Sequence, residues 1–321
     1  MPSAKTAPKP KAIEPMRKAM AIINPAAAAG RANGHWQQFK AVFDGEIDFN
    51  ECFTIEPGHA AELTRNALQN GHSLVLAVGG DGTVNEVANG FLADGLPINP
   101  SAELAIVPRG TGTDFVRTLA VPQTPEELLE AIRKRNTRAL DLGAITCHSH
   151  DDREITRYFI NVADCGYGGA LLQRYGSLNR ILPGPPAYFL GLLINLFTYK
   201  NPLLHFRIDG GETQTGRCNA LIAANAQYFG GGMWIAPTAE VDDGYFEIIQ
   251  IGDVSKFEVL ANVRRIYNGT LCEHPKVRCV RAKKLEVWSD ETVLLDVDGE
   301  LPGKLPATFE IVPGAIRVVT A

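Results

Sequence analysis

The sequence predicts an α/β N-terminal domain with a doubly wound, mostly parallel sheet, followed by a β-rich C-terminal domain built as an antiparallel sandwich. Two observations predict this. Short apolar runs alternate with helix-like segments over residues 19–141, an order typical of a parallel sheet covered by helices. After Asp141-Leu142-Gly143 strand-like runs dominate, and Asp-Gly and Gly-Gly turns separate them.

The first domain is predicted from the order of its apolar runs. Thr124, Pro125 and Glu127 place an N-cap, a first-turn proline and a capping glutamate at the start of its last helix. The expected strands are 20–23, 51–55, 74–78 and 104–107, and the expected helices are 33–43, 59–69, 84–92 and 124–135. Candidate binding loops follow the strands directly, and ligands bind at such carboxyl ends in open α/β sheets.

The second domain is expected over residues 142–313, with residues 314–321 returning to the first domain. Its expected strands are 158–162, 205–208, 219–224, 245–251, 285–288 and 309–312. Residues 1–18 are rich in Pro, Ala and Lys and lack the apolar stretch of a signal peptide, so we expect a disordered tail.

Composition excludes several classes of protein. The chain has 321 residues, which is long enough for two domains. It has 31 basic and 36 acidic side chains, so it lacks the positive charge expected of a nucleic-acid binder. Its six cysteines form no C-x-x-C pair, so free thiols and a cytoplasmic location are expected. No run is long and apolar enough to predict a transmembrane helix.

The most informative motif is the glycine turn Gly79-Gly80-Asp81-Gly82-Thr83 between a strand and a helix. Backbone N–H groups can converge on a phosphate there. A carboxylate facing phosphate requires a divalent cation between them, so Asp81 indicates a metal–nucleotide complex. The alternative is that Asp81 only starts a helix whose capping box is Thr83 and Glu86.

These residues resemble a known family. The glycine turn with Asn85-Glu86-Val87 is similar to the signature of the diacylglycerol kinase catalytic domain family, which includes bacterial soluble lipid kinases and sphingosine and ceramide kinases. NAD kinases share the turn. Further segments resemble the family in order: Asn24-Pro25 with Gly30, Thr54 with Gly58-His59-Ala60, Pro108 to Phe115, Tyr228 to Gly244, and Asp298-Gly299-Glu300.

The resemblance implies the roles of the candidate site residues. Glu300 is the expected base for a substrate hydroxyl, and Asp81 its catalytic partner at the metal. Asp114 and Asp141 are expected to organise a metal–water network between the domains. The remaining nucleotide contacts implied are Asn24, Pro25, Thr54, Gly79, Gly80, Gly82, Thr83, Asn85, Glu86 and Thr111. Asp298-Gly299 is also a good hairpin turn by itself.

A second, structural Mg²⁺ is implied in the loop from Ala239 to Tyr245. Carried over by position, its ligands are the Asp243 carboxylate and the carbonyls of Glu240 and Tyr245, and a plain Asp-Gly turn is the alternative. Thr113 stands where the family usually has Asn, and its hydroxyl has fewer hydrogen-bond donors than an amide. A kinase of weakened activity is therefore one of the alternatives.

The resemblance implies an ATP-dependent, Mg²⁺-requiring kinase that transfers the γ-phosphoryl group of ATP to a lipid hydroxyl, most plausibly that of diacylglycerol. Sphingoid bases, other lipid alcohols, NAD, or nucleotide binding without catalysis are the alternatives. We expect transient contact with a membrane surface, and a homodimer is left open. The apolar segment 187–198 is expected to be a core helix packed on the sheet; otherwise it lines an acyl-chain pocket or touches the membrane.

Overall fold

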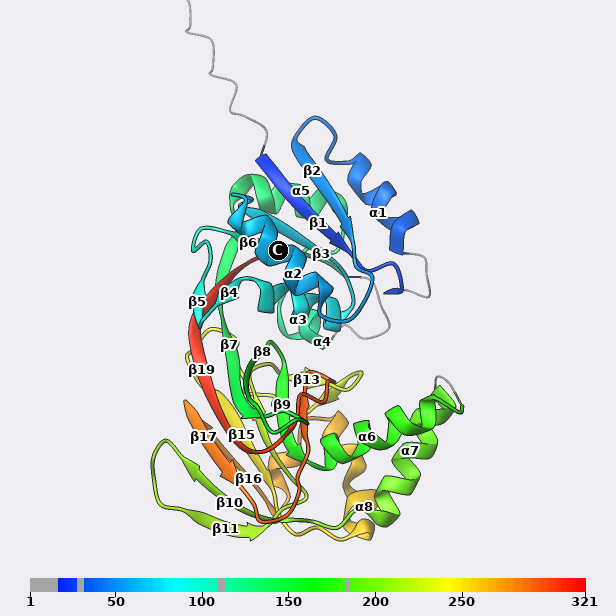
Figure 1. The fold of residues 1–321 in the computed structure, drawn as a ribbon, viewed down its shortest axis with the longest axis vertical. Helices are drawn as coiled ribbons and strands as arrows, with labels where there is room; N and C mark the ends of the chain where they lie inside the picture. The colour runs from blue at the N-terminus through cyan, green and yellow to red at the C-terminus, as the bar shows by residue number, and fades with distance from the viewer. Residues whose placement is uncertain (1–16, 28–31, 109–113, 183–184) are drawn as a thin grey trace, which may run out of the picture.

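The computed structural model describes residues 17–27, 32–108, 114–182 and 185–321. Figure 1 shows an α/β body above a β-rich body, with the long strands β7 (Thr137–His148) and β19 (Lys304–Val319) running between them. The predicted fold class is confirmed. Glycine 30 and residues 109–113, with the expected contact Thr111 and the departure Thr113, lie outside the described residues.

The N-terminal half has parallel strands in the order β6-β3-β1-β2. Strand β3 is buried along its whole length, as expected where helices cover both faces of a sheet. The elements are β1 (Arg17–Ile23), α1 (Ala32–Ala41), β2 (Ile47–Phe53), α2 (His59–Gln69), β3 (Leu74–Gly79), α3 (Asp81–Gly90), β4 (Leu92–Ala93), β5 (Leu96–Pro97), β6 (Glu103–Pro108), α4 (Asp114–Thr118) and α5 (Pro125–Lys134). The capping box predicted at Thr124 and Glu127 is confirmed.

The C-terminal half is largely antiparallel, and five of its strands form a separate sheet in the order β16-β15-β12-β9-β18. Its elements after β7 are β8 (Glu154–Phe159), β9 (Val162–Gly166), α6 (Tyr167–Asn179), α7 (Pro185–Thr198), β10 (Leu203–Ile208), β11 (Gln214–Arg217), β12 (Ala220–Ala224), β13 (Tyr228–Phe229), β14 (Met233–Trp234), β15 (Phe246–Ile251), α8 (Lys256–Tyr267), the 3-10 turn η2 (Leu271–Glu273), β16 (Val277–Ala282), β17 (Lys284–Trp288), β18 (Leu295–Val297) and β19.

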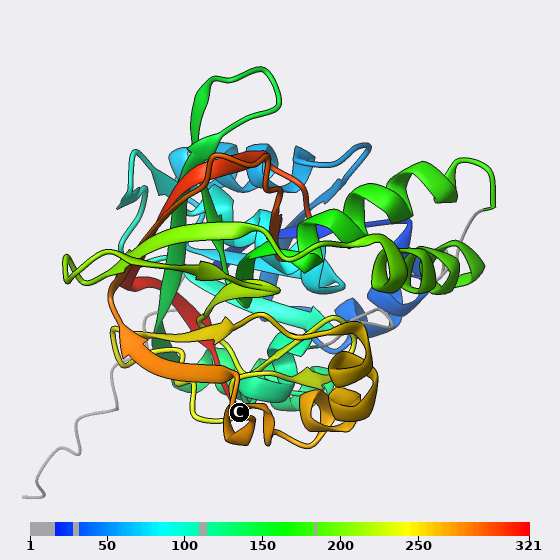
Figure 2. The same ribbon diagram turned by 90° about the horizontal axis from the view of Figure 1, so that it is seen from below.

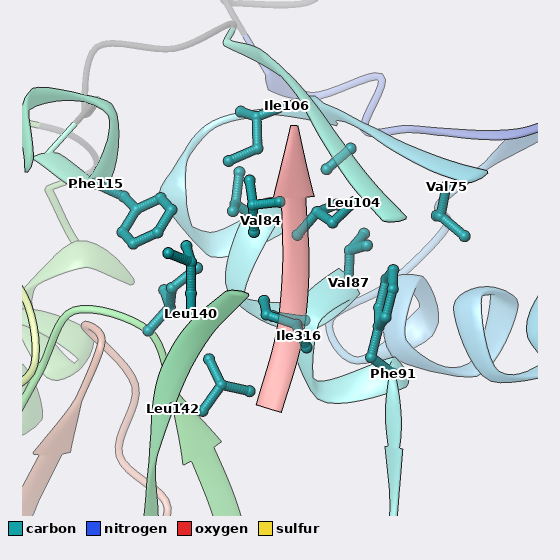
Figure 3. Close-up of a cluster of buried hydrophobic side chains, with 14 of the residues drawn as sticks. Val75, Val84, Val87, Phe91, Leu104, Ile106, Phe115, Leu140, Leu142 and Ile316 are labelled. Atoms are coloured by element: carbon teal, nitrogen blue, oxygen red, sulfur yellow. The ribbon is translucent and has the colours of Figure 1, made fainter. Parts of the chain in front are cut away.

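Strand β19 joins the halves into one continuous sheet. Its first part pairs antiparallel with β17 and β7, and its last residues pair parallel with β6, where Arg317 is opposite Glu103. Figure 3 shows the resulting core, in which Val84 and Val87 of α3 lie with Leu140 of β7 and Ile316 of β19. The helix that follows the glycine turn is therefore packed against strands of both halves.

The structure corrects the prediction that residues 187–198 form a core helix. Helix α7 packs on α6, where Gly191 lies against Tyr175 and Leu178, and Asn195 donates to the Tyr167 carbonyl at 3.3 Å. Its large apolar side chains stay outside: Phe189 is 63% exposed and Phe197 is 58% exposed. The reason is that α7 forms a helical hairpin with α6, and no sheet or further helix layer of the described residues covers its remaining faces.

The cysteines also differ from the prediction of free thiols throughout. Cys272 and Cys279 form a disulfide with their Cα atoms 5.9 Å apart, whereas Cys147, Cys165 and Cys218 are buried and free. The two cysteines come together because η2 turns the chain back onto β16. Their spacing is not that of a C-x-x-C pair, so the sequence did not indicate this contact. In the described part of the chain, no helix combines the length and the apolar character needed to cross a bilayer.

Candidate active site

Four predicted loops meet along one edge of the parallel sheet. Asn24 follows β1, Thr54 follows β2, Gly79 ends β3 and Pro108 ends β6, and these strands are direct neighbours. The backbone ties the loops together, since the Thr54 N–H donates to Ile23 and the Asn24 N–H donates to Val78. Asn24 also closes its own turn by accepting from the Ala26 N–H across the exposed Pro25. The predicted contacts therefore share one edge.

The glycine turn is held close to the helix it starts. A Cβ atom on Gly79 would lie 2.3 Å from the Thr83 Oγ1, so only glycine fits there. A Cβ atom on Gly82 would meet none of the described residues within 4 Å, which leaves space among them on that side of the turn. Gly80 is the N-cap residue, and helix α3 begins at Asp81 rather than at Val84. Free backbone N–H groups of the first turn are thus available to an anion.

The capping box predicted for Thr83 and Glu86 is wrong. Thr83 lies inside the helix and accepts a 3.1 Å hydrogen bond from the Asn24 amide, which links the first and third loops. Glu86 reaches across to helix α2, where its Oε2 accepts from the Ala60 N–H at 3.1 Å. The helix starts too early for the pattern, because the extended backbone of Gly80 can serve as N-cap without a side chain.

Asp81 caps a different helix from its own. Its Oδ2 accepts from the Asp114 N–H at 2.8 Å and its Oδ1 from the Phe115 N–H at 3.4 Å, at the start of α4. Burial raises the pKa of Asp81, the Asp114 hydrogen bond opposes this, and the nearby Asp114 charge raises the pKa further. Asp81 thereby fixes the glycine turn against the start of α4.

Asp114 leaves an unsatisfied oxygen beside Asp81. Its Oδ2 accepts from the Gly231 N–H at 2.7 Å, while its Oδ1 is buried and has no partner among the described residues. A hard cation is a suitable partner for such an oxygen. The described residues hold no group of three or more His, Cys, Asp or Glu able to bind a metal, so Mg²⁺ would draw its other ligands from phosphate and water. The residues present fit a metal of that kind.

The Asp-Gly-Glu turn reaches the same helix from the other half. Asp298 and Gly299 both have positive φ, and Val297 and Glu300 exchange backbone hydrogen bonds, which makes the predicted two-residue hairpin turn. The side-chain amide of Asn85 of α3 lies 3.3 Å from the Asp298 Oδ2, a hydrogen bond when the amide nitrogen rather than its oxygen faces Asp298. Glu86 of the same helix is near enough to Glu300 for its charge to raise the Glu300 pKa. The turn therefore lies against the face of α3 that follows Asp81.

The two carboxyl groups of this turn have different environments. Burial raises the pKa of Asp298 to about 7, although its oxygens accept from the backbone N–H groups of Val162, Ile160 and Asn161. Burial also raises the pKa of Glu300, next the negative charge of Glu86 raises it, and Arg157 lowers it. Asp298 is occupied in fixing the turn between β8 and β9, whereas part of the Glu300 side chain is exposed to solvent although the surrounding protein partly desolvates its carboxyl group.

Asp141 lies elsewhere in the interdomain region. Its carboxylate accepts from the Gly244 N–H and the Gly314 N–H, both at 2.7 Å, and its carbonyl accepts from Asn225. Burial raises its pKa. These contacts join β7, the loop before β15 and the bulge in β19. Asp141 therefore links three backbone segments by hydrogen bonds.

The loop proposed for a second Mg²⁺ does not present a free carboxylate. Asp243 accepts from the Tyr245 N–H at 2.9 Å and pairs with Arg281, whose guanidinium lies 4.6 Å from the centre of the Tyr245 ring. Glu240 is exposed. A cation here would compete with Arg281 for Asp243, so these residues as placed do not fit the metal.

Three residues of this region were not singled out from the sequence. Asn89 donates to the Tyr158 carbonyl at 2.8 Å and accepts from the Tyr158 N–H at 3.0 Å, clamping α3 to β8. Arg117 lies 6.0 Å from the centre of the Tyr228 ring and lowers the pKa of Asp81, and Arg157 acts on Glu300. The arginines had no local pattern because their partners are distant in sequence.

Comparison with known proteins agrees with this arrangement. Residues 18–145 match the family model described as the diacylglycerol kinase catalytic domain, and residues 162–320 match the YegS C-terminal NAD kinase beta sandwich-like domain. A diacylglycerol kinase of Staphylococcus carnosus (strain TM300) is 30% identical over 267 residues, covering 83% of each chain. A diacylglycerol kinase of Staphylococcus aureus (strain JH9) is 31% identical over 257 residues, covering 80% of this chain and 77% of its own.

Solved structures share the fold at lower identity. A crystal structure from Bacillus anthracis str. Sterne has a TM-score of 0.71 and 23% identity, covering 95% of this chain and 97% of its own. Yeast NADH kinase complexed with NADH has a TM-score of 0.56 and 12% identity, covering 98% and 88%. The family model and the two relatives show that the chain is an enzyme of the lipid kinase class. The chain belongs to the diacylglycerol kinase family.

Proposed function

We propose that this lipid kinase transfers the γ-phosphoryl group of ATP to the free hydroxyl of diacylglycerol. The observation that carries the proposal is the contact between the Asp-Gly-Glu turn and α3. It brings a carboxyl group with a raised pKa, Glu300, to the helix whose N-terminus is the glycine turn. Phosphoryl transfer requires a base near a phosphate cradle, and here both lie beside one helix.

In the proposed reaction, the substrate hydroxyl gives its proton to the Glu300 carboxylate as its oxygen bonds to the γ-phosphorus. The bond between that phosphorus and the β,γ-bridging oxygen breaks, and ADP leaves. Backbone N–H groups of the glycine turn orient the phosphates, and the open space beside Gly82 accommodates them. Mg²⁺ held by Asp114 and Asp81 would neutralise phosphate charge. A raised pKa suits Glu300 to its task, because a base works best near the ambient pH.

The test is a transfer assay with γ-labelled ATP against diacylglycerol, a sphingoid base, another lipid alcohol and NAD. Diacylglycerol is expected to be the best acceptor. Glu300→Gln and Asp81→Asn should each abolish most of the transfer, while Glu130→Gln, which changes an exposed glutamate of α5, should not. Transfer that survives both site variants would rule out the assigned roles. Preferred labelling of another acceptor would replace diacylglycerol as the substrate.

A further inference from the structure

Two acidic side chains lie side by side next to the Asp-Gly-Glu turn. Asp164 of β9 and Asp296 of β18 are directly opposite each other in the antiparallel pairing of these strands. Their Cβ atoms are therefore on the same face of the sheet, about 5 Å apart. Figure 2 shows helix α6, which follows β9 directly, leaving the sheet in its hairpin with α7. Asp164 is only 3% exposed and Asp296 is half-buried, and neither has a role in the proposed reaction.

Asp296 is tied to the turn that carries the base. Its Oδ1 accepts a hydrogen bond from the Gly299 N–H at 2.8 Å. Gly299 has a φ of 84° and stands between Asp298 and Glu300, so its backbone sets the direction in which the Glu300 side chain leaves the turn. Asp298 holds another side of the turn through the Val162 N–H of β9. A displacement of Asp296 therefore reaches Glu300 through Gly299.

Asp164 has one oxygen without a partner. The Gly168 N–H in the first turn of α6 hydrogen-bonds to the Asp164 carboxyl group. A Cβ atom on Gly168 would lie 2.2 Å from the Asp164 Oδ2, so this glycine leaves room that a larger residue would fill. The Asp164 Oδ1 is buried and has no partner among the described residues. A buried carboxylate oxygen without a donor is costly, and a proton shared with Asp296 removes that cost.

The surroundings of the pair favour its protonated form. Burial raises the pKa of Asp164 well above its ordinary range, and the Asp296 charge raises it further. Burial raises the pKa of Asp296 to about 6, although the hydrogen bond from Gly299 opposes this. The other titratable groups that interact with the pair are Asp298 beside β18, Cys165 on β9, Tyr188 on α7 and Tyr199 after α7. In the described part of the chain no basic side chain neutralises either carboxyl group, so the pair keeps a proton near neutral pH.

We propose that Asp164 and Asp296 are a positioning pair for the base: one proton held between them keeps the Asp296 oxygen on the Gly299 N–H, and the turn then presents Glu300 to the acceptor hydroxyl. The pair gives no proton to the substrate. When its last proton leaves, two negative charges face each other and repel. Asp296 is the group that moves, because it is half-buried whereas Asp164 is enclosed, and its hydrogen bond to Gly299 is lost. Activity is therefore present below the pH of this second ionisation and is lost above it. The inference rests on the proposed function for the role of Glu300.

The pH dependence of kcat tests the pair, with γ-labelled ATP, diacylglycerol and the full chain. Asp296→Asn keeps an oxygen for Gly299 and removes one charge, so kcat at neutral pH should stay within about twofold and the alkaline limb should move up by about one pH unit or more. Asp164→Asn should move this limb in the same direction. Glu247→Gln is the matched control and should leave the limb in place. Glu247 is a buried acid of β15 in the same sheet, and burial raises its pKa too.

Asp296→Leu separates a positioning role from a purely structural tie between β9 and β18. Leucine has no acceptor for the Gly299 N–H, so kcat should fall about tenfold or more, because a slightly displaced base is much less effective. The KM for ATP should stay within about twofold, since the glycine turn is untouched. An alkaline limb that stays in place in both Asn variants would overturn the inference. Equal kcat values for Asp296→Asn and Asp296→Leu at neutral pH would also overturn it.

A readout without turnover keeps this result separate from the proposed function. Amide hydrogen exchange at Gly299, followed by NMR at one pH, should be slow in the original chain and in Asp296→Asn and about tenfold or more faster in Asp296→Leu. That pattern together with no transfer to diacylglycerol would mean that the proposed function has failed and that the contact of Asp296 with the turn stands. Equal exchange in the three proteins would overturn the positioning pair whatever the acceptor.

Discussion

The carboxylate of Asp81 accepts a 2.8 Å hydrogen bond from the backbone N–H of Asp114, which joins two loops that are 33 residues apart in the chain. We expect Asp81→Asn to lower the free energy of unfolding by about 1–2 kcal/mol, because an amide can accept from only one side. Urea denaturation measures this loss. Asp48→Asn, at an exposed position of β2, is the control and should change little. Equal stability of the two variants would contradict the capping role.

The charge next to Glu300 should set the acidic limb of the pH–rate profile. Glu300 must be deprotonated to act as a base, and Arg157 lowers its pKa. Arg157→Gln should therefore raise this pKa and move the acidic limb of kcat/KM to higher pH. If the pH–rate profiles of the original chain and the Arg157→Gln variant coincide, Arg157 does not influence the pKa of the catalytic base.

Glu300→Gln should lower kcat about 10²–10⁴-fold.

Gly79 and Gly82 should respond differently to the same substitution. Gly79→Ala places its Cβ 2.3 Å from Thr83 and should destabilise the fold by about 2 kcal/mol or more. Gly82→Ala meets none of the described residues within 4 Å and should change the free energy of unfolding by less than about 1 kcal/mol. If phosphate occupies the space beside Gly82, this variant still loses affinity for ATP, which isothermal titration would detect. Unchanged affinity would place the phosphate elsewhere.

Asn89 should be important for stability because both its amide groups bond the backbone of Tyr158. Asn89→Ala leaves a carbonyl and an N–H without these partners and should cost about 2–3 kcal/mol. Thermal or urea denaturation measures the cost, with Asn50→Ala on the exposed side of β2 as control. A loss no larger than that of the control would show that water replaces the clamp without penalty.

Asp296 should destabilise the protein at alkaline pH. It lies opposite Asp164 on neighbouring strands, and burial raises its pKa from 3.8 to about 6. The native state therefore holds a proton that the unfolded chain has lost, and the free energy of unfolding falls as pH rises through this range.

Asp296→Asn keeps an oxygen for the Gly299 N–H, which donates to the Asp296 carboxylate at 2.8 Å. The variant should be stabilised by about 1–2 kcal/mol at about pH 8 and by about half as much at about pH 5. Urea denaturation at the two pH values measures the difference. A gain that is the same at both values would mean that the carboxylate charge is not its cause.

The local patterns predicted most of the elements and the gathering of the four loops. Helix α2 begins and ends at the expected residues, and α5 has the expected capping box, because caps and apolar periodicity act within a few residues. Strand β2 begins at Ile47, earlier than expected, since its first residues alternate in burial and carry no continuous apolar run.

The side-chain partners of the site could not be predicted in the same way. Glu86 caps α2 and Asp81 caps α4, although each has the sequence context of a cap for its own helix. Which helix each carboxylate caps depends on which unsatisfied N–H groups lie close to it in the folded chain. That proximity is set by the packing of segments that are distant in sequence. The exposure of the apolar side chains of α7 could not be predicted for the same reason. An apolar run does not indicate whether another layer of the fold will cover it.

By itself, the sequence determined the alternation of strands and helices, the glycine turn, the Asp-Gly-Glu turn and the family, because each depends on neighbouring residues. Only the tertiary structure decided that the Asp-Gly-Glu turn lies beside α3, that Asp298 fixes this turn, and that Cys272 bonds Cys279. The disulfide joins cysteines seven residues apart, and it depends on how η2 and β16 pack. The other outcomes need contacts across more than a hundred residues, and such contacts form only when β19 and α3 bring the two halves together.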